Sequence, residues 1–86
     1  MSQAEAFRQC VASVRAGRLV QAEAQGRALL RNNPSDAVLW HLLGVIVARQ
    51  DRPDEALALF GKALEITPRS ASILHDQAIA FHRIST

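Results

Sequence analysis

The sequence predicts an all-α fold in which helical hairpins stack into a superhelix. The first observation is an internal repeat of 34 residues, which is the spacing between Pro34 and Pro68. The same offset aligns further identical pairs: Val11 with Val45, Arg15 with Arg49, Ala22 with Ala56, and Leu30 with Leu64. The other is a composition rich in alanine and leucine but only 5% aromatic, which favours helices over strands. The 86 residues should form one domain of five helices, whose hairpins bury their apolar faces against each other.

Glycine and proline bound the first two helices. The first helix should run to about Ala16 and stop at Gly17, because glycine readily takes the left-handed conformation that closes a helix. The second should begin near Arg18 and end before Pro34, whose ring pushes Asn33 out of helical geometry.

Polar residues that can cap backbone N–H groups precede the other three helices. The candidate N-caps are Ser35 or Asp36, then Asp51, then Ser70. The third helix should end near Gln50 and the fourth near Ile66, and Pro53 is tolerated in the first turn of the fourth. The connections are two to four residues long, which is typical of antiparallel helical hairpins.

Residues 37–70 carry the clearest motif. Its members are Trp40, Leu43, Gly44, Ala56, Phe60 and Pro68. This set resembles the tetratricopeptide-repeat pattern W-x2-L-G-x2-Y, A-x3-F and P, with Val47 in place of the aromatic residue. Small residues at Gly44 and Ala56 suit a close approach of two helices, and the larger members would fill the space around them.

The resemblance covers almost the whole chain as two and a half repeats. Residues 3–36 are a degenerate first repeat, whose motif positions hold Ala6, Cys10, Ser13 and Gly26. Residues 71–86 supply the first helix of a third repeat or a C-terminal capping helix. Terminal repeats are usually atypical, so these departures fit a tetratricopeptide-repeat solenoid.

Charge and hydropathy argue against nucleic acid and membrane partners. Ten Lys and Arg against eight Asp and Glu leave a net charge of +2, without the basic run of a nucleic-acid binder. The longest apolar run, residues 38–48, is interrupted by His41 and is too short to cross a bilayer. One cysteine and the lack of a signal peptide at the N-terminus make the cytoplasm the expected location.

The sequence shows no arrangement typical of catalysis, a cofactor or a metal site, so we expect no enzyme. His75 and His82 are seven residues apart, whereas a chelating pair on a helix is three or four apart. His41 lies one repeat before His75, which places the two on adjacent helices. Cys10 takes the place of a small packing residue and should be buried.

The family resemblance implies a concave groove for a partner, lined by the first helix of each repeat. The expected lining residues are Phe7, Val11, Val14 and Arg15, then His41, Leu42, Val45 and Arg49, then His75, Asp76, Ile79, His82 and Arg83. Residues one period apart form two rows, an apolar row of Val11, Val45 and Ile79 and a basic row of Arg15, Arg49 and Arg83. Such a groove suits an amphipathic helix or an extended apolar segment with an acidic flank.

One ligand of the family is not expected here. Members that grip the acidic C-terminus of heat-shock chaperones use lysine, asparagine and arginine at set groove positions. The matching positions of this sequence hold Phe7, Val11, Leu42, Ser72 and Asp76. None of these residues can clamp a carboxylate, so we do not expect this chain to bind that acidic C-terminus.

The last helix should expose an apolar edge. Leu74, Ala78 and Phe81 share one stripe that a second helix would cover in a full repeat. We therefore expect a homodimer, packed edge to edge or with exchanged helices, unless the natural chain continues past Thr86.

The sequence favours a non-catalytic scaffold for a protein partner of unknown identity. Two alternatives stay open: a module for self-association, and the N-terminal arm of a larger enzyme such as a bacterial glycosyl- or sulfotransferase, which similar repeats often precede. A DNA-binding helix-turn-helix is disfavoured because the sequence has no basic recognition helix.

Overall fold

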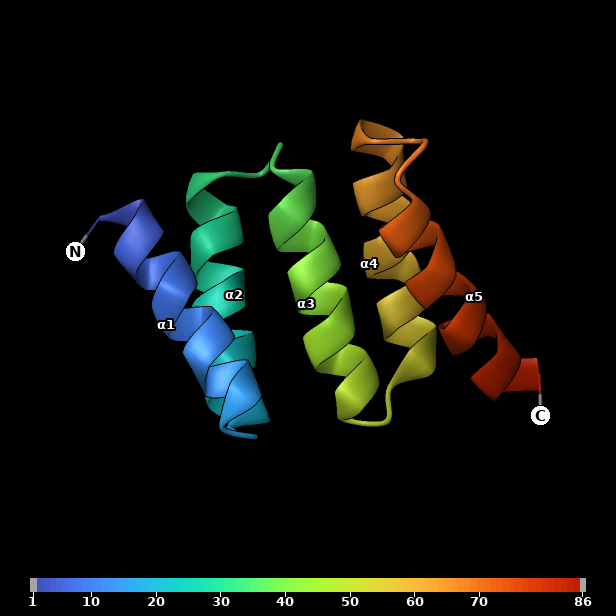
Figure 1. Ribbon diagram of the computed structural model, residues 1–86, viewed down its shortest axis with the longest axis horizontal. Helices are drawn as coiled ribbons and strands as arrows, with labels where there is room; N and C mark the ends of the chain where they lie inside the picture. The colour runs from blue at the N-terminus through green and yellow to red at the C-terminus, as the bar shows by residue number, and fades with distance from the viewer. Residues whose placement is uncertain (1, 86) are drawn as a thin grey trace.

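The computed structural model describes residues 2–85, which form five α-helices in the predicted order (Figure 1). The helices are α1 (Gln3–Arg15), α2 (Leu19–Asn32), α3 (Ala37–Arg49), α4 (Pro53–Ile66) and α5 (Ala71–Ser85). No strand occurs within the described range. The predicted all-α fold of helical hairpins is confirmed.

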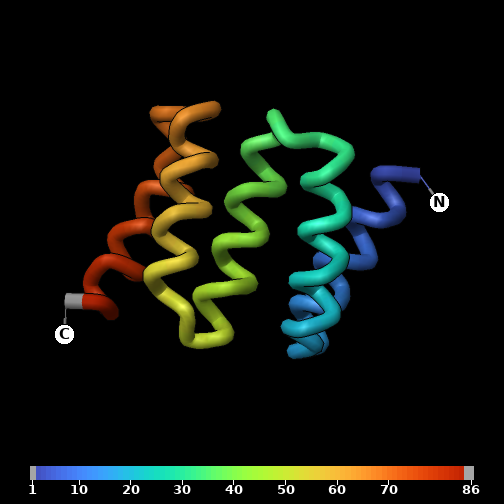
Figure 2. The backbone as a smooth tube through the Cα atoms, turned by 180° about the vertical axis from the view of Figure 1, so that it is seen from behind, coloured from blue at the N-terminus to red at the C-terminus, as the bar shows by residue number. Residues whose placement is uncertain are grey.

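Each helix packs against the next one along the chain, and α3 also contacts α5. The resulting stack is elongated, with extents of 40 × 26 × 18 Å. In Figure 1, α1 and α5 lie in front of α2 and α4. Figure 2 shows the opposite face, where α2, α3 and α4 lie side by side. The stack therefore has two broad faces built from different helices.

The helix ends follow the predicted local chemistry in three places. Gly17 has φ +77° and closes α1 in the left-handed conformation. Asn33, with φ −142° and ψ 64°, leaves helical geometry before Pro34. Of the two candidates for the α3 cap, Asp36 is the one used, because its carboxylate accepts a hydrogen bond from the backbone N–H of Val38 at 3.0 Å.

The predicted N-cap Asp51 is wrong. Arg52 occupies the N-cap position of α4, but its side chain makes no capping hydrogen bond. Pro53 lies in the first turn of α4, as expected. Asp51 lies one residue earlier with φ +62°, and its carboxylate accepts a hydrogen bond from Nη2 of Arg83 at 2.9 Å. Aspartate tolerates this left-handed conformation better than most residues do, so Asp51 is a residue of the turn before α4 and not its N-cap.

The core is centred on α3. The largest fully buried side chains are Phe60, Leu39, Leu43, Ile46, Val47 and Cys10, and four of these six belong to α3. Cys10 is buried as expected, and its Sγ lies 3.4 Å from the carbonyl oxygen of Ala22. Burial raises the pKa of the Cys10 thiol, so it packs as a small apolar residue.

Glu23 joins the two hairpins through a charged network. Its carboxylate accepts hydrogen bonds from Nη1 of Arg52, Nη2 of Arg27 and Nε2 of Gln50, each at 2.8 Å. Both guanidinium groups also bond Glu55, at 2.6 Å from Arg52 and 2.9 Å from Arg27. Chiefly because of Arg52, the pKa of Glu23 falls from 4.5 to about 2. The network therefore ties α2 to the start of α4.

Candidate functional site

The structure brings together expected groove residues from the second and third units. A pocket of about 250 Å³ opens between α3 and α5, and its lining consists of Val45, Ala48, Arg49, Phe60, Asp76, Ile79, Ala80 and Arg83. Five of these were expected in the groove from the sequence: Val45, Arg49, Asp76, Ile79 and Arg83. The contact between α3 and α5 is what places them around one hollow.

The inner part of this pocket is apolar. Phe60 and Ala80 are almost fully buried, at 1% and 2% exposed, whereas Val45 is half-buried and Ile79 is 48% exposed. Phe60 reaches this pocket from α4, and the sequence motif indicated only its role in packing. A partner side chain entering here would contact Val45 and Ile79 first and the Phe60 ring below them.

His41 and Asp76 pair with each other across the wall of the pocket. The His41 Nε2 atom lies 2.7 Å from Oδ2 of Asp76, and both side chains are partly buried. The His41 ring also meets Phe60 edge to face, with centroids 5.8 Å apart and an interplanar angle of 67°. The first contact joins α5 to α3, and the second joins α3 to α4. Among the described residues, no group of three metal-ligating side chains is present.

The three arginines of the basic row differ in their surroundings. Arg83 reaches back from α5, where Nη1 donates to the carbonyl oxygen of Ala48 at 3.1 Å and Nη2 donates to Asp51. Arg49 and Arg15 are exposed, and within residues 2–85 neither forms an ion pair. Arg49 is therefore the cation at this pocket that is available for a partner carboxylate.

The expected groove residues of the first unit form a separate hollow. Phe7, Val11 and Arg15 line a pocket together with Arg8, Ala12 and Ala16, and no residue of α3 contributes to it. The apolar row of Val11, Val45 and Ile79 is thus divided between two hollows.

Val14 was expected in the groove, and this assignment is wrong. It is 8% exposed and belongs to the core. Val14 follows Cys10 by four residues, so both lie on the α1 face that packs into the interior. The neighbouring Ser13 is also buried there, and its hydroxyl donates to Oε1 of Gln25 at 2.8 Å.

The remaining expected groove residues make no common pocket. Leu42 is partly buried and packs against the core. His75 and His82 are exposed on α5. They lie on the surface of the last helix, and neither lines the pocket that holds Val45 and Ile79.

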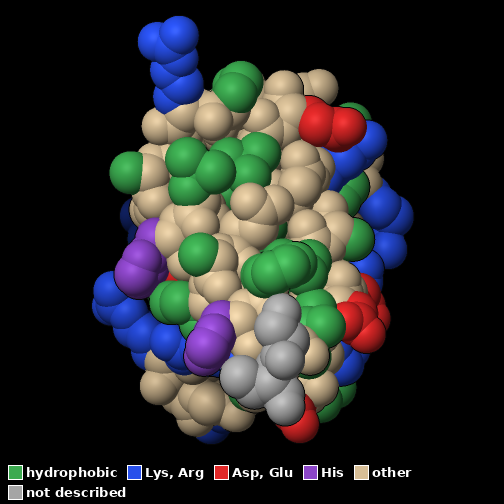
Figure 3. Space-filling model, turned by 90° about the vertical axis from the view of Figure 1, so that its right-hand side faces the viewer, with side chains coloured by type: hydrophobic (Ala, Val, Ile, Leu, Met, Phe, Trp, Pro, Cys, Tyr) green, Lys and Arg blue, Asp and Glu red, His purple; other side chains and the backbone are tan. Residues whose placement is uncertain are grey.

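The predicted apolar edge of α5 is exposed. Leu74 is 45% and Phe81 is 63% exposed, and Ala78 between them is exposed as well. Ile79, which lines the pocket between α3 and α5, and Ile84 are also exposed, so α5 holds four of the seven exposed large hydrophobic residues in the described part of the chain. Figure 3 looks onto the α5 side and shows several hydrophobic side chains on it. Exposed large apolar side chains are therefore concentrated on α5.

Comparison with known proteins identifies the repeat. Residues 37–70 match the family model of the tetratricopeptide repeat, over the same span that the sequence motif defined. The chain therefore contains a tetratricopeptide repeat, and its helical-hairpin architecture is the one expected of that family. Within the described residues, no helix is both long and apolar enough to cross a membrane.

The curated relatives are receptors from yeasts. The chain is 30% identical over 54 residues to a peroxisomal targeting signal receptor of Candida glabrata, 33% over 54 residues to that of Kluyveromyces lactis, and 31% over 51 residues to that of Saccharomyces cerevisiae. These matches cover 63%, 63% and 59% of the chain but only 9%, 10% and 8% of the receptors. The chain thus spans about a tenth of the length of these relatives, and the similarity supports a protein-interaction scaffold.

Proposed function

We propose that this tetratricopeptide-repeat chain is a non-catalytic scaffold that binds a peptide or helix of a partner protein between α3 and α5. The observation that carries the proposal is the pocket in which Val45 and Ile79, from successive repeats, meet over the buried ring of Phe60. The relatives agree with this class of function, because their name describes receptors for a targeting signal.

The pocket suits an apolar side chain followed by an acidic one. The half-buried Val45 and exposed Ile79 supply apolar area that water would leave on binding. Arg49 lies at the same pocket without an ion pair in the described part of the chain, so it can pair with a partner carboxylate. The carboxylate of Asp76 lines the same pocket and is bonded to His41, so an acidic side chain of the partner should lie toward Arg49 and away from Asp76.

Val45→Asp should abolish this binding. A carboxylate at the half-buried position would have to lose its hydration beside an apolar ligand, which is unfavourable. The measurement is capture of partners from host lysate with mass spectrometry, followed by affinity measurements on the partner found. We expect a loss of affinity of more than about tenfold.

Val20→Asp is the matched control, because Val20 is 78% exposed on α2 and lies outside this pocket. It should retain all the partners of the wild-type chain. Charge reversal at Arg49 should instead slow association and weaken its dependence on salt. If the Val45→Asp chain captures the same partners with the same affinity, the groove is not the binding site.

Self-association through α5 is the second function that the structure favours. Leu74, Ala78 and Phe81 form an exposed apolar surface on one side of the stack. A two-fold pairing of these surfaces would bury the same side chains from both copies. Burying a side chain as large as Leu or Phe contributes about 1.5 to 3 kcal/mol, which supports a dimer after the cost of association is subtracted.

Phe81→Glu should convert this dimer into a monomer. The substitution places a charge on the largest side chain of the proposed contact. This side chain is 63% exposed, so the fold of each copy should survive. Sedimentation equilibrium is the measurement, with Val20→Glu as a control that should still dimerise. A wild-type chain that stays monomeric at hundreds of micromolar would contradict the proposal.

A further inference from the structure

We propose a second interaction surface, around Trp40, that takes an acidic segment of a partner protein carrying apolar side chains. It is separate from the groove between α3 and α5. Trp40 and Arg49 are nine residues apart, which is two and a half turns of α3, so they lie on opposite sides of that helix. Trp40 lines a pocket with residues of α2, and a lysine of α4 lies over its ring. Figure 2 shows α2 and α4 on either side of α3.

The surface contains a hollow with an apolar interior. A pocket of about 360 Å³ is lined by Arg27, Leu30, Arg31, Pro34, Trp40 and Leu43. Leu30 and Leu43 are buried, at 8% and 1% exposed, whereas Trp40 is only partly buried and Pro34 is exposed. An apolar side chain entering the hollow would therefore meet Trp40 and Pro34 above an apolar base.

The indole ring of Trp40 is held in place by the protein. Its Nε1–H donates to the carbonyl oxygen of Pro34 at 2.8 Å, so the polar edge of the ring is already satisfied. Lys62 of α4 lies over the ring, with Nζ 6.0 Å from its centroid. The part of the ring that remains exposed is therefore apolar and preorganised, which lowers the cost of binding.

The charge at the edge of this hollow is positive. Arg31 is exposed, and its guanidinium makes no hydrogen bond or ion pair within residues 2–85. Besides its contact with the Trp40 ring, Lys62 pairs with Glu65 at 3.5 Å on the exposed surface, where such pairs contribute little. Arg27, by contrast, is engaged with Glu23 and Glu55. Arg31 and Lys62 are thus available to carboxylates, and this complementarity selects an acidic partner.

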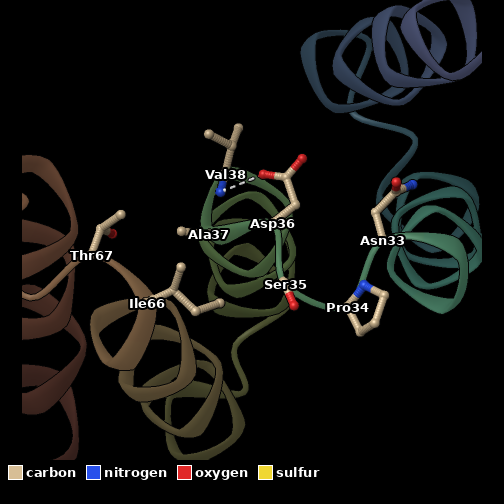
Figure 4. A pocket seen from close by; sticks show the side chains of 8 residues that line it. All are labelled: Asn33, Pro34, Ser35, Asp36, Ala37, Val38, Ile66 and Thr67. Carbon is tan, nitrogen blue, oxygen red and sulfur yellow. Dashed lines mark hydrogen bonds between the residues drawn. The ribbon is translucent and has the colours of Figure 1, made fainter.

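A second hollow adjoins the first at Pro34. Figure 4 shows it between the loop before α3 and the end of α4, with Val38 and Ile66 at its wall. Val38 is 59% and Ile66 is 39% exposed, so this notch offers a place for a second apolar side chain. Asp36 lines the same notch with its carboxylate bonded to the N–H of Val38. The acidic end of the ligand should therefore lie toward Arg31, away from Asp36.

The protein contains an intrinsic fluorescent probe of this surface. Trp40 is the single tryptophan and the sequence has no tyrosine, so the emission of the chain excited at tryptophan wavelengths reports on this hollow. The ligand to titrate is the synthetic hexapeptide Asp-Glu-Asp-Glu-Leu-Leu with an amidated C-terminus, which carries its acidic residues at one end only and is not fluorescent. We expect a saturable blue shift of the emission as the leucines exclude water from the ring. The hexapeptide Lys-Lys-Lys-Lys-Leu-Leu, amidated in the same way, should produce no shift.

Arg31→Glu should weaken the binding of the acidic peptide by about tenfold, and Arg31→Gln should weaken it by an intermediate factor. Circular dichroism should show that both variants fold. The matched control is Arg49→Glu on the opposite side of α3, which should leave the affinity within about twofold. Three results would each overturn the proposal. They are the absence of a saturable shift with the acidic peptide, an equal response to the basic one, and a weakening by Arg49→Glu as large as that by Arg31→Glu, which would place the peptide between α3 and α5.

Discussion

Gly44→Ala should destabilise the fold by about 2 to 3 kcal/mol, although it adds a single methyl group. A Cβ atom placed on Gly44 would lie 2.6 Å from Cδ1 and 3.1 Å from Cζ of the Phe60 ring. Phe60 is 1% exposed and enclosed by the core, so the ring cannot move aside without displacing other side chains. In a small domain of modest stability, a loss of this size should unfold a large fraction of the molecules at physiological temperature.

Gly61→Ala is the matched control, because Gly61 is also inside a helix and a Cβ there would meet nothing within 4 Å. Alanine loses less backbone freedom on folding, so this variant should be more stable than the wild type by about 0.5 to 1 kcal/mol. Urea denaturation followed by circular dichroism measures both variants. Equal midpoints for the two would show that helix propensity, and not the contact with Phe60, governs Gly44.

The fold was predictable because the repeat motif contains the residues through which the helices contact one another. Gly44 and Phe60 are separated by sixteen positions in the sequence, yet the motif already paired a small residue with a large one. Gly17 and Pro34 likewise predicted the helix ends through the backbone conformations that they favour. Asp51 misled the prediction because aspartate suits both an N-cap and a left-handed turn residue. In the structure it occupies the turn, and its carboxylate bonds Arg83, which lies far away in the sequence.

The candidate site was predictable only where helical periodicity determines exposure. Val45 and Ile79 are one repeat apart and meet in the same pocket, as their alignment implied. Val14 is buried because the orientation of α1 is set by packing on α2, which the family alignment does not specify. The pairing of His41 with Asp76 depends on the distance between α3 and α5. Tertiary packing therefore decided the details that periodicity left open.

The Glu23 network shows a similar limit of sequence reasoning. Glu23 contacts Gln50 and Arg52, which follow it by 27 and 29 residues. These spacings are shorter than the 34-residue period, so a comparison of equivalent positions does not bring the partners together. The stacking of α2 against the second hairpin creates the contact. Because the network connects two hairpins, it contributes to the alignment of the repeats as well as to stability.

Glu23→Gln should lower the free energy of unfolding by about 2 kcal/mol at neutral pH. The carboxylate is 16% exposed and accepts hydrogen bonds from Arg52, Arg27 and Gln50, so the loss of its charge leaves the guanidinium groups with a weaker partner. The fall of the Glu23 pKa from 4.5 to about 2 corresponds to about 3 kcal/mol before screening by solvent is considered, which agrees with a loss near 2.

This contribution should depend on pH in a defined direction. The folded-state pKa of Glu23 lies below its unfolded value, so the unfolded chain binds more protons and the stabilisation is fully present only above about pH 4.5. It should be lost as the pH falls from there toward 2. Denaturation midpoints of the wild type and the Glu23→Gln variant, measured from neutral to acidic pH, should therefore differ at pH 7 and converge near pH 2. A difference that stays constant across this range would show that the charge of Glu23 does not stabilise the fold.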